Sequence, residues 1–100
     1  MMVTDGRDVA GTCKVTRRAE GLTWTEVDGE IFVLDSAEGF YLHLNATAAF
    51  LWEQLAEVRT VDDLVAAAQS AFAGDAAEVR AGVIELLELL HSRGVVSLQD

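Results

Sequence analysis

The sequence predicts an α+β fold, a three-stranded antiparallel sheet followed by a three-helix bundle, which is the arrangement of a winged helix-turn-helix domain. Three observations lead to it. Two runs rich in β-forming residues flank the turn signal Asp28-Gly29. A third such run leads straight into Asn45, a residue typical of helix N-caps. Three stretches with helical periodicity follow.

The expected strands are residues 22–27, 30–35 and 40–44. Asp28-Gly29 predicts a two-residue hairpin, because Gly accepts the positive φ that such turns need. Four consecutive apolar residues in 30–35 indicate a middle strand that is covered on both faces. In the third strand, alternation puts Phe40, Leu42 and Leu44 on one face and Tyr41 and His43 on the other.

The expected helices are residues 46–57, 61–73 and 76–92. Thr60 and Asp63 form a T-x-x-D capping pattern before the second helix. Trp52 is interpreted as a core anchor of the first helix, and Leu86 and Leu90 as core residues of the third. Residues 95–98 are predicted to form a short terminal strand or an extended tail.

Length and charge indicate one acidic domain behind a polar arm. The chain has 100 residues, 51% of them hydrophobic, which suffices for a single domain with its own core. We expect a flexible N-terminal arm in residues 1–20, with 14–18 as a candidate extension of the first strand, and the folded domain in residues 21–100. The net charge of −10 is concentrated in that domain, where three basic residues stand against fourteen acidic ones. This balance argues against a nucleic-acid partner, since such affinity rests on Lys and Arg at phosphates.

The chain offers no catalytic or metal-binding constellation. Its candidates are His43, His91 and Cys13, which fall on separate expected elements, whereas a metal site needs several converging ligands. His91 falls in the last turn of a helix, where a cationic side chain favours the dipole. We interpret Cys13, the single cysteine, as an incidental thiol in a polar segment of a protein from a reducing compartment. We therefore expect no enzyme activity, no metal and no cofactor.

Targeting signals are not apparent in the sequence. The first residues carry charge and lack the apolar stretch of a signal peptide. No apolar run approaches the roughly 18 residues that would suggest a membrane span. We therefore expect a cytoplasmic protein without a membrane partner.

The third expected strand leaves one edge of the sheet open. An exposed edge presents unpaired N–H and C=O groups, to which an extended peptide can add as a further strand. Residues 40–44 contain neither Pro nor Lys, the usual blocking residues. If the helix 76–92 packs beside this strand, the two form a groove. The pattern thus favours peptide capture, and leaves open a helix that covers the edge or a homodimer that pairs through it.

The sequence resembles the PqqD family. The resemblance is carried mainly by residues 28–35 (DGEIFVLD), by residues 39–45 (GFYLHLN) and by Thr47-Ala48 with Trp52. It covers about residues 22–98, and the segments 60–64, 86–90 and 94–96 also fit. The resemblance implies a winged-helix domain that acts as the recognition element for ribosomally synthesised and post-translationally modified peptides (RiPPs).

The resemblance also implies a binding mode. Proteins of this family bind the leader region of a precursor peptide as an added strand, between the third strand and the third helix, and present the core region to a modifying enzyme. On this sequence, Arg80 becomes a candidate partner for a leader carboxylate. The implied leader-binding residues are Phe40, Tyr41, Leu42, His43, Val79, Arg80, Val83, Ile84 and Leu87.

Within the family, residues 34–35 (LD) and 39–41 (GFY) are most similar to the small stand-alone proteins of lasso-peptide pathways. Those proteins deliver the precursor to a leader peptidase, and a cyclase then closes the ring. Relatives that serve pyrroloquinoline quinone assembly tend to have Pro-Glu-Gly before the third strand, where this chain has residues 36–39 (SAEG). The alternatives are a peptide chaperone for a radical enzyme, as in pyrroloquinoline quinone-type pathways, and a winged-helix transcription regulator.

Overall fold

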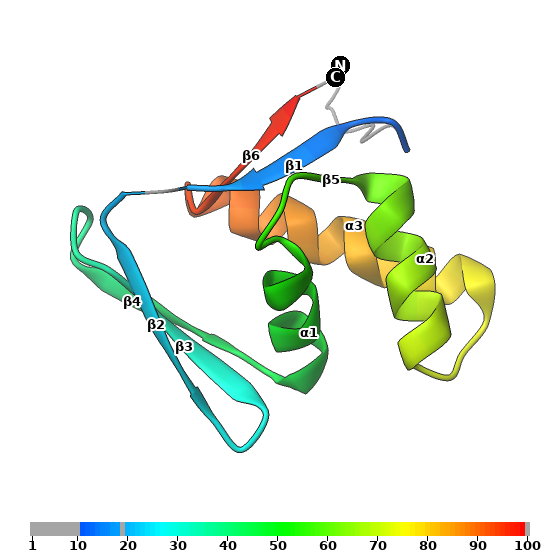
Figure 1. The fold of residues 1–100 in the computed structure, drawn as a ribbon, viewed down its shortest axis with the longest axis horizontal. Coiled ribbons are helices and arrows are strands. Elements are labelled where there is room, and N and C mark those ends of the chain that lie inside the picture. Colours follow the sequence, from blue (N-terminus) through cyan, green and yellow to red (C-terminus); the bar gives the residue numbers. More distant parts are fainter. Residues whose placement is uncertain (1–10, 19, 100) are drawn as a thin grey trace.

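A computed structural model describes residues 11–18 and 20–99, and these residues form two small sheets and three helices (Figure 1). The arm expected in residues 1–10 lies outside the described residues. In chain order the elements are β1 (Lys14–Arg17), β2 (Leu22–Val27), β3 (Glu30–Asp35), β4 (Phe40–Leu44), α1 (Ala46–Gln54), β5 (Arg59–Thr60), α2 (Val61–Ala71), α3 (Ala76–Ser92) and β6 (Val96–Gln99).

The expected antiparallel sheet is present, with strand order β2-β3-β4. Asp28 (φ 54°) and Gly29 (φ 82°) both adopt the left-handed conformation that the two-residue turn between β2 and β3 requires. β3 is the middle strand, as predicted, but the expectation that both its faces are covered is wrong. Ile31 is buried on the face toward the helices, whereas Phe32 and Leu34 are 41% and 47% exposed on the other. The described elements pack on one face of this sheet only (Figure 1).

A second sheet, with strand order β5-β1-β6, was not predicted as such. β6 confirms the expected terminal strand and pairs antiparallel with β1 along its whole length, from Lys14↔Gln99 to Arg17↔Val96. The prediction that the flexible arm extends to residue 20 is therefore wrong for residues 11–18, and residues 14–17 form a strand of this second sheet rather than an extension of the strand at residues 22–27. Cys13, which was expected in a polar segment, is instead buried in the core, and so is Val15. The strand is short and mostly polar, so its alternation was too weak to recognise.

The three helices begin where the sequence predicts, because each start has a side-chain cap. Asn45 accepts a hydrogen bond from the Ala48 N–H (3.0 Å), and Thr60 and Asp63 form a reciprocal capping box. α1 and α2 end at Gln54 and Ala71, two to three residues before the predicted ends. None of the helices in residues 11–18 and 20–99 has the length and apolar character that a membrane span requires.

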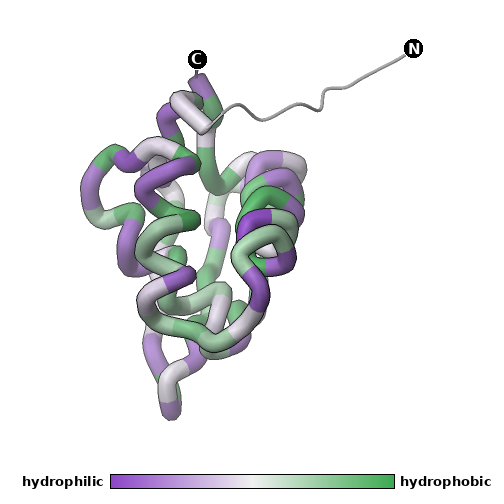
Figure 2. The backbone as a smooth tube through the Cα atoms, turned by 90° about the vertical axis from the view of Figure 1, so that its right-hand side faces the viewer, coloured by the Kyte–Doolittle hydropathy of each residue, from purple (hydrophilic) through white to green (hydrophobic). Residues whose placement is uncertain are grey.

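The core lies between the helices and the inner faces of the two sheets. Along the helices in Figure 2, hydrophobic and hydrophilic residues succeed one another within each turn, as one-sided burial requires. Trp52 of α1 is fully buried, which confirms it as a core anchor. The Arg17 guanidinium carbon lies 4.5 Å from the Trp24 ring centroid and 5.2 Å from that of Trp52, so a β1 side chain fastens β2 to α1.

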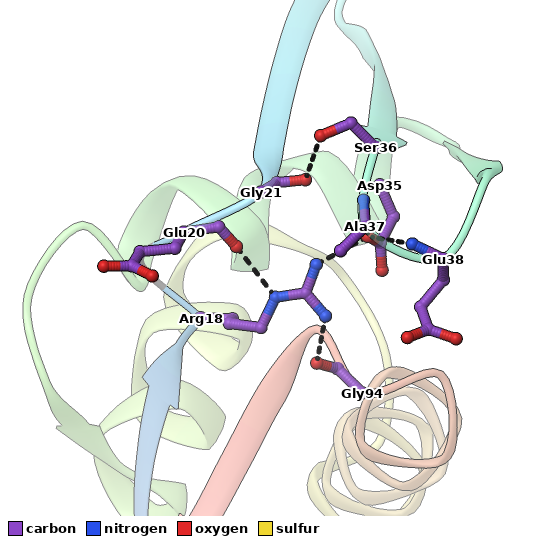
Figure 3. Close-up of polar contacts among 8 residues, drawn as sticks. All are labelled: Arg18, Glu20, Gly21, Asp35, Ser36, Ala37, Glu38 and Gly94. Carbon is purple, nitrogen blue, oxygen red and sulfur yellow. Dashed lines mark hydrogen bonds and ion pairs between the residues drawn. The ribbon is translucent and has the colours of Figure 1, made fainter.

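Arg18 connects the two sheets (Figure 3). Its Nη2 donates to Asp35 Oδ1 at the end of β3 (2.6 Å), and its Nη1 donates to the carbonyl of Gly94 before β6 (3.2 Å). The same Asp35 oxygen accepts the N–H groups of Ala37 and Glu38, both at 3.1 Å, which fixes the turn into β4. The hydrogen bond from Arg18 lowers the pKa of the Asp35 carboxyl below its ordinary value, and the two backbone donors add to this against the opposing effect of burial.

We expect the stabilisation from Asp35 to depend on pH. Its pKa is lowered in the folded state, whereas Asp in an unfolded chain titrates near about pH 3.9. The contribution is therefore complete above about pH 5 and is lost as the pH falls through the lowered folded-state pKa. Asp35→Asn should reduce the free energy of unfolding at neutral pH, and the difference in this free energy between the variant and the parent protein should shrink as the pH falls below the unfolded-state pKa. Guanidinium denaturation across this range measures both effects.

The matched control is Glu57→Gln. Glu57 and Arg59 form an exposed pair with an N–O distance of 3.9 Å, which is expected to contribute at most about 1 kcal/mol. Its removal should change stability little at any pH. An Asp35→Asn protein as stable as the parent at neutral pH would contradict the structural role of Asp35.

Candidate functional site

β4 forms an open edge of the first sheet. Within the described residues it pairs on one side only, with β3, in a register that places Leu42 opposite Val33 and Tyr41 opposite Leu34. Every second residue of an edge strand directs its N–H and C=O away from the sheet. As predicted, Phe40, Leu42 and Leu44 share the inner face and Tyr41 and His43 the outer one. The edge is thus able to accept a further strand.

The outer face beside this edge carries aromatic side chains. The His43 ring stacks on Phe32 with centroids 4.8 Å apart and an interplanar angle of 25°. His43 Nε2 also pairs with Glu30 Oε1, so the imidazole is held by a ring and a carboxylate. Tyr41 is 70% exposed. The described contacts of the His43 ring are thus Phe32 and Glu30, and its role in leader binding stays a prediction.

An apolar cavity lies between the start of α1, the end of α2 and the N-terminal part of α3. Its volume is about 590 Å³, and Asn45, which directly follows β4, is one of its lining residues. Most of its lining is apolar, and Glu78 is the single charged residue among the described residues that line it. Such a lining suits an uncharged, bulky group. The lining residues are Asn45, Thr47, Ala48, Leu51, Ala68, Phe72, Ala73, Gly74, Glu78, Val79, Gly82, Val83 and Leu86.

The residues predicted for the wall on α3 separate into two groups. Val79 and Val83 line the cavity between the helices, and their role as leader contacts stays a prediction. Arg80, Ile84 and Leu87 do not line it: Leu87 is fully buried in the core, and Ile84 packs against the core. Leu90 is buried, as assigned.

Leu86 was assigned to the core, and that assignment is corrected. It is only partly buried and lines the cavity, whereas its neighbour Leu87 takes the central position. A run of four apolar side chains surrounding one glutamate, residues 86–90, does not show which leucine faces inward.

Arg80 points toward α2 rather than toward β4. Its Nη1 donates to Asp62 Oδ1 at 3.2 Å, and both side chains are exposed. A ligand carboxylate at this position would have to compete with Asp62. The role of Arg80 as a leader contact stays a prediction.

The cavity also includes residues that the sequence did not single out. Leu51 comes from α1, Phe72 from the end of α2, and Gly82 from α3. The predicted groove was composed of β4 and α3 alone. In the structure, α3 meets α1 and α2 at the cavity. The C-terminal end of α3 contacts the first residue of β4, because the Arg93 guanidinium carbon lies 5.8 Å from the Phe40 ring centroid. Contacts between helices cannot be inferred from the periodicity of each helix alone.

Comparison with known proteins agrees with this architecture. The fold is similar to that of TbiB1, solved in complex with the TbiA(beta) leader peptide, with a TM-score of 0.74 and 20% sequence identity over 82% of this chain and 95% of that chain. No curated protein matches the sequence significantly. The family profile described as coenzyme PQQ synthesis protein D (PqqD) matches residues 30–96, which include β3, β4 and all three helices. The chain therefore belongs to the PqqD family.

Proposed function

We propose that this protein binds the leader region of a ribosomally synthesised precursor peptide as an added strand on β4, without catalysing a reaction itself. The observation that carries the proposal is the open edge of β4, a strand that is followed directly by Asn45, one of the lining residues of the cavity. Membership of the PqqD family and the likeness to TbiB1, which was solved with a leader peptide, support it.

The edge and the cavity would contribute differently to binding. Main-chain hydrogen bonds to β4 supply affinity for any extended peptide of compatible shape. The cavity selects among peptides by accepting apolar side chains, because burial of apolar surface is favourable while an unpaired buried charge is costly. The ligand is therefore an extended segment with bulky apolar residues at one end of the added strand.

Strand addition is tested by an NMR titration of labelled protein with a synthetic leader of the precursor encoded beside this gene. We expect the largest amide shifts at β4, from Phe40 to Leu44, and at the cavity wall, from Val79 to Leu86, because these residues border the added strand. β6 pairs with β1 in the other sheet and serves as the internal control. Shifts confined to β6, or an unchanged spectrum at high micromolar leader, would refute the proposal.

The cavity is tested separately with two leucines of α3. Leu86 lines the cavity, whereas Leu89 is 49% exposed and does not. Leu86→Ala should weaken leader binding by about tenfold, as expected for the loss of an apolar interface contact. Leu89→Ala should leave the affinity within about twofold. Isothermal titration calorimetry measures both, and equal losses in the two variants would exclude the cavity from the binding site.

We further propose that the bound leader is delivered to a leader peptidase of a lasso-peptide pathway, with a cyclase as a later partner, in the cytoplasm. The similarity of residues 34–35 and 39–41 to the stand-alone proteins of such pathways supports this assignment. With this protein present, the leader peptidase of the same pathway should cleave the precursor at least about tenfold faster, through the higher local concentration of substrate. A cleavage rate that does not depend on the protein would favour the radical-enzyme alternative.

A homodimer through the β4 edge stays a prediction, and it would compete with the leader for the same hydrogen-bonding groups.

A further inference from the structure

Gly82 lies in the interior of α3, where glycine is unfavourable. The helix runs from Ala76 to Ser92, and glycine in a helix interior is less favourable than alanine because it loses more backbone freedom on folding. The same helix uses alanine at Ala76, Ala77 and Ala81. A glycine at this position therefore needs a reason other than helix stability.

The described structure contains no packing reason for Gly82. A Cβ atom built on it would meet no heavy atom within 4 Å, and its φ lies outside the positive range. Other glycines of the chain differ: a Cβ on Gly11 would lie 2.3 Å from an oxygen of Asp62, and Gly74 has a φ of 142°. Neither a close neighbour nor the backbone conformation requires glycine at residue 82.

The open space beside Gly82 belongs to the apolar cavity. Gly82 lines it together with Val79, Val83 and Leu86, which precede and follow it on the same face of α3. A side chain at residue 82 would therefore project from the helix into the space where a ligand side chain would lie. The missing side chain is what leaves this part of the wall open.

We propose that Gly82 is a specificity-determining residue, which lets a bulky apolar side chain of the leader rest directly on the backbone of α3. This inference builds on the proposed function. Leu51, Phe72 and Leu86 line the same cavity, and their apolar side chains indicate the chemistry of the group that it would admit. Glycine makes the helix less stable than alanine would, but it leaves space for the side chain of the ligand.

The test combines folding and binding measurements on three variants. Gly82→Ala should raise the melting temperature by about 2 to 6 °C, and should weaken binding of the synthetic leader by about fivefold or more, because the methyl group overfills the site. Gly82→Leu should abolish leader binding. Ala81→Gly is the matched control: Ala81 is exposed and does not line the cavity, so this change should lower the melting temperature by a similar amount and leave binding unchanged.

A second probe, toluene, tests the cavity without the leader. We expect toluene to shift the amide signals of Val79 and Leu86 in the parent protein and not in Gly82→Leu, since apolar cavities accept small aromatic molecules.

Leader binding that is equal in the parent protein and both Gly82 variants would overturn the role of Gly82 and leave the proposed function intact. Toluene binding that is lost in Gly82→Leu, without leader binding to the parent, would overturn the proposed function and support the open wall. The role of Gly82 would also be overturned if Gly82→Ala melted at a lower temperature than the parent protein, or if the parent protein bound neither toluene nor the leader.

Discussion

The ion pair between Arg18 and Asp35 is the constraint on which the geometry of the site depends. β4 belongs to one sheet and α3 packs beneath the other, and Arg18 is bonded to both parts through Asp35 and the Gly94 carbonyl. Asp35 also holds the turn that leads into β4. A buried carboxylate such as that of Asp35 is costly unless it is paired. The hydrogen bonds of Asp35 therefore strongly favour the single arrangement of its partners that satisfies the carboxylate. The edge strand is therefore positioned before any ligand arrives.

Such preorganisation matters for a site that is an edge and a cavity rather than a closed pocket. An added strand gains hydrogen bonds only if β4 is already straight and in register, and ordering a loose strand on binding would reduce the affinity. Arg17 contributes to the same end, since its guanidinium lies against Trp24 of β2 and buried Trp52 of α1. Arg17, the last residue of β1, and Arg18, which follows it, thus fix the β2-β3-β4 sheet to the helices, although β1 itself lies far from the edge of β4.

Sequence reasoning predicted the elements that have strong local signals. The Asp28-Gly29 turn, the Asn45 cap and the alternation in β4 are local properties, and the structure has all three. The β5-β1-β6 sheet was missed because it pairs residues that are far apart in the sequence, such as Lys14 with Thr60 and with Gln99, through strands of two to four residues. The cavity between the helices was not predicted, for a related reason. The sequence suggested a groove between residues 40–44 and helix 76–92, whereas the contribution of Phe72 depends on how the helices meet.

The division of the site into edge and cavity also accounts for the distribution of charge. The chain is strongly acidic, yet a single carboxylate, that of Glu78, belongs to the described lining of the cavity, and the β4 edge presents main-chain groups. Acidic residues at the binding surfaces would have repelled acidic leaders and burdened the cavity with desolvation costs. All acidic residues of the described chain except Glu78 thus lie outside the lining of the cavity. Under the proposed function, selection of the peptide therefore rests on shape and apolar surface, and Gly82 is a point of the lining where a Cβ atom would meet no heavy atom within 4 Å.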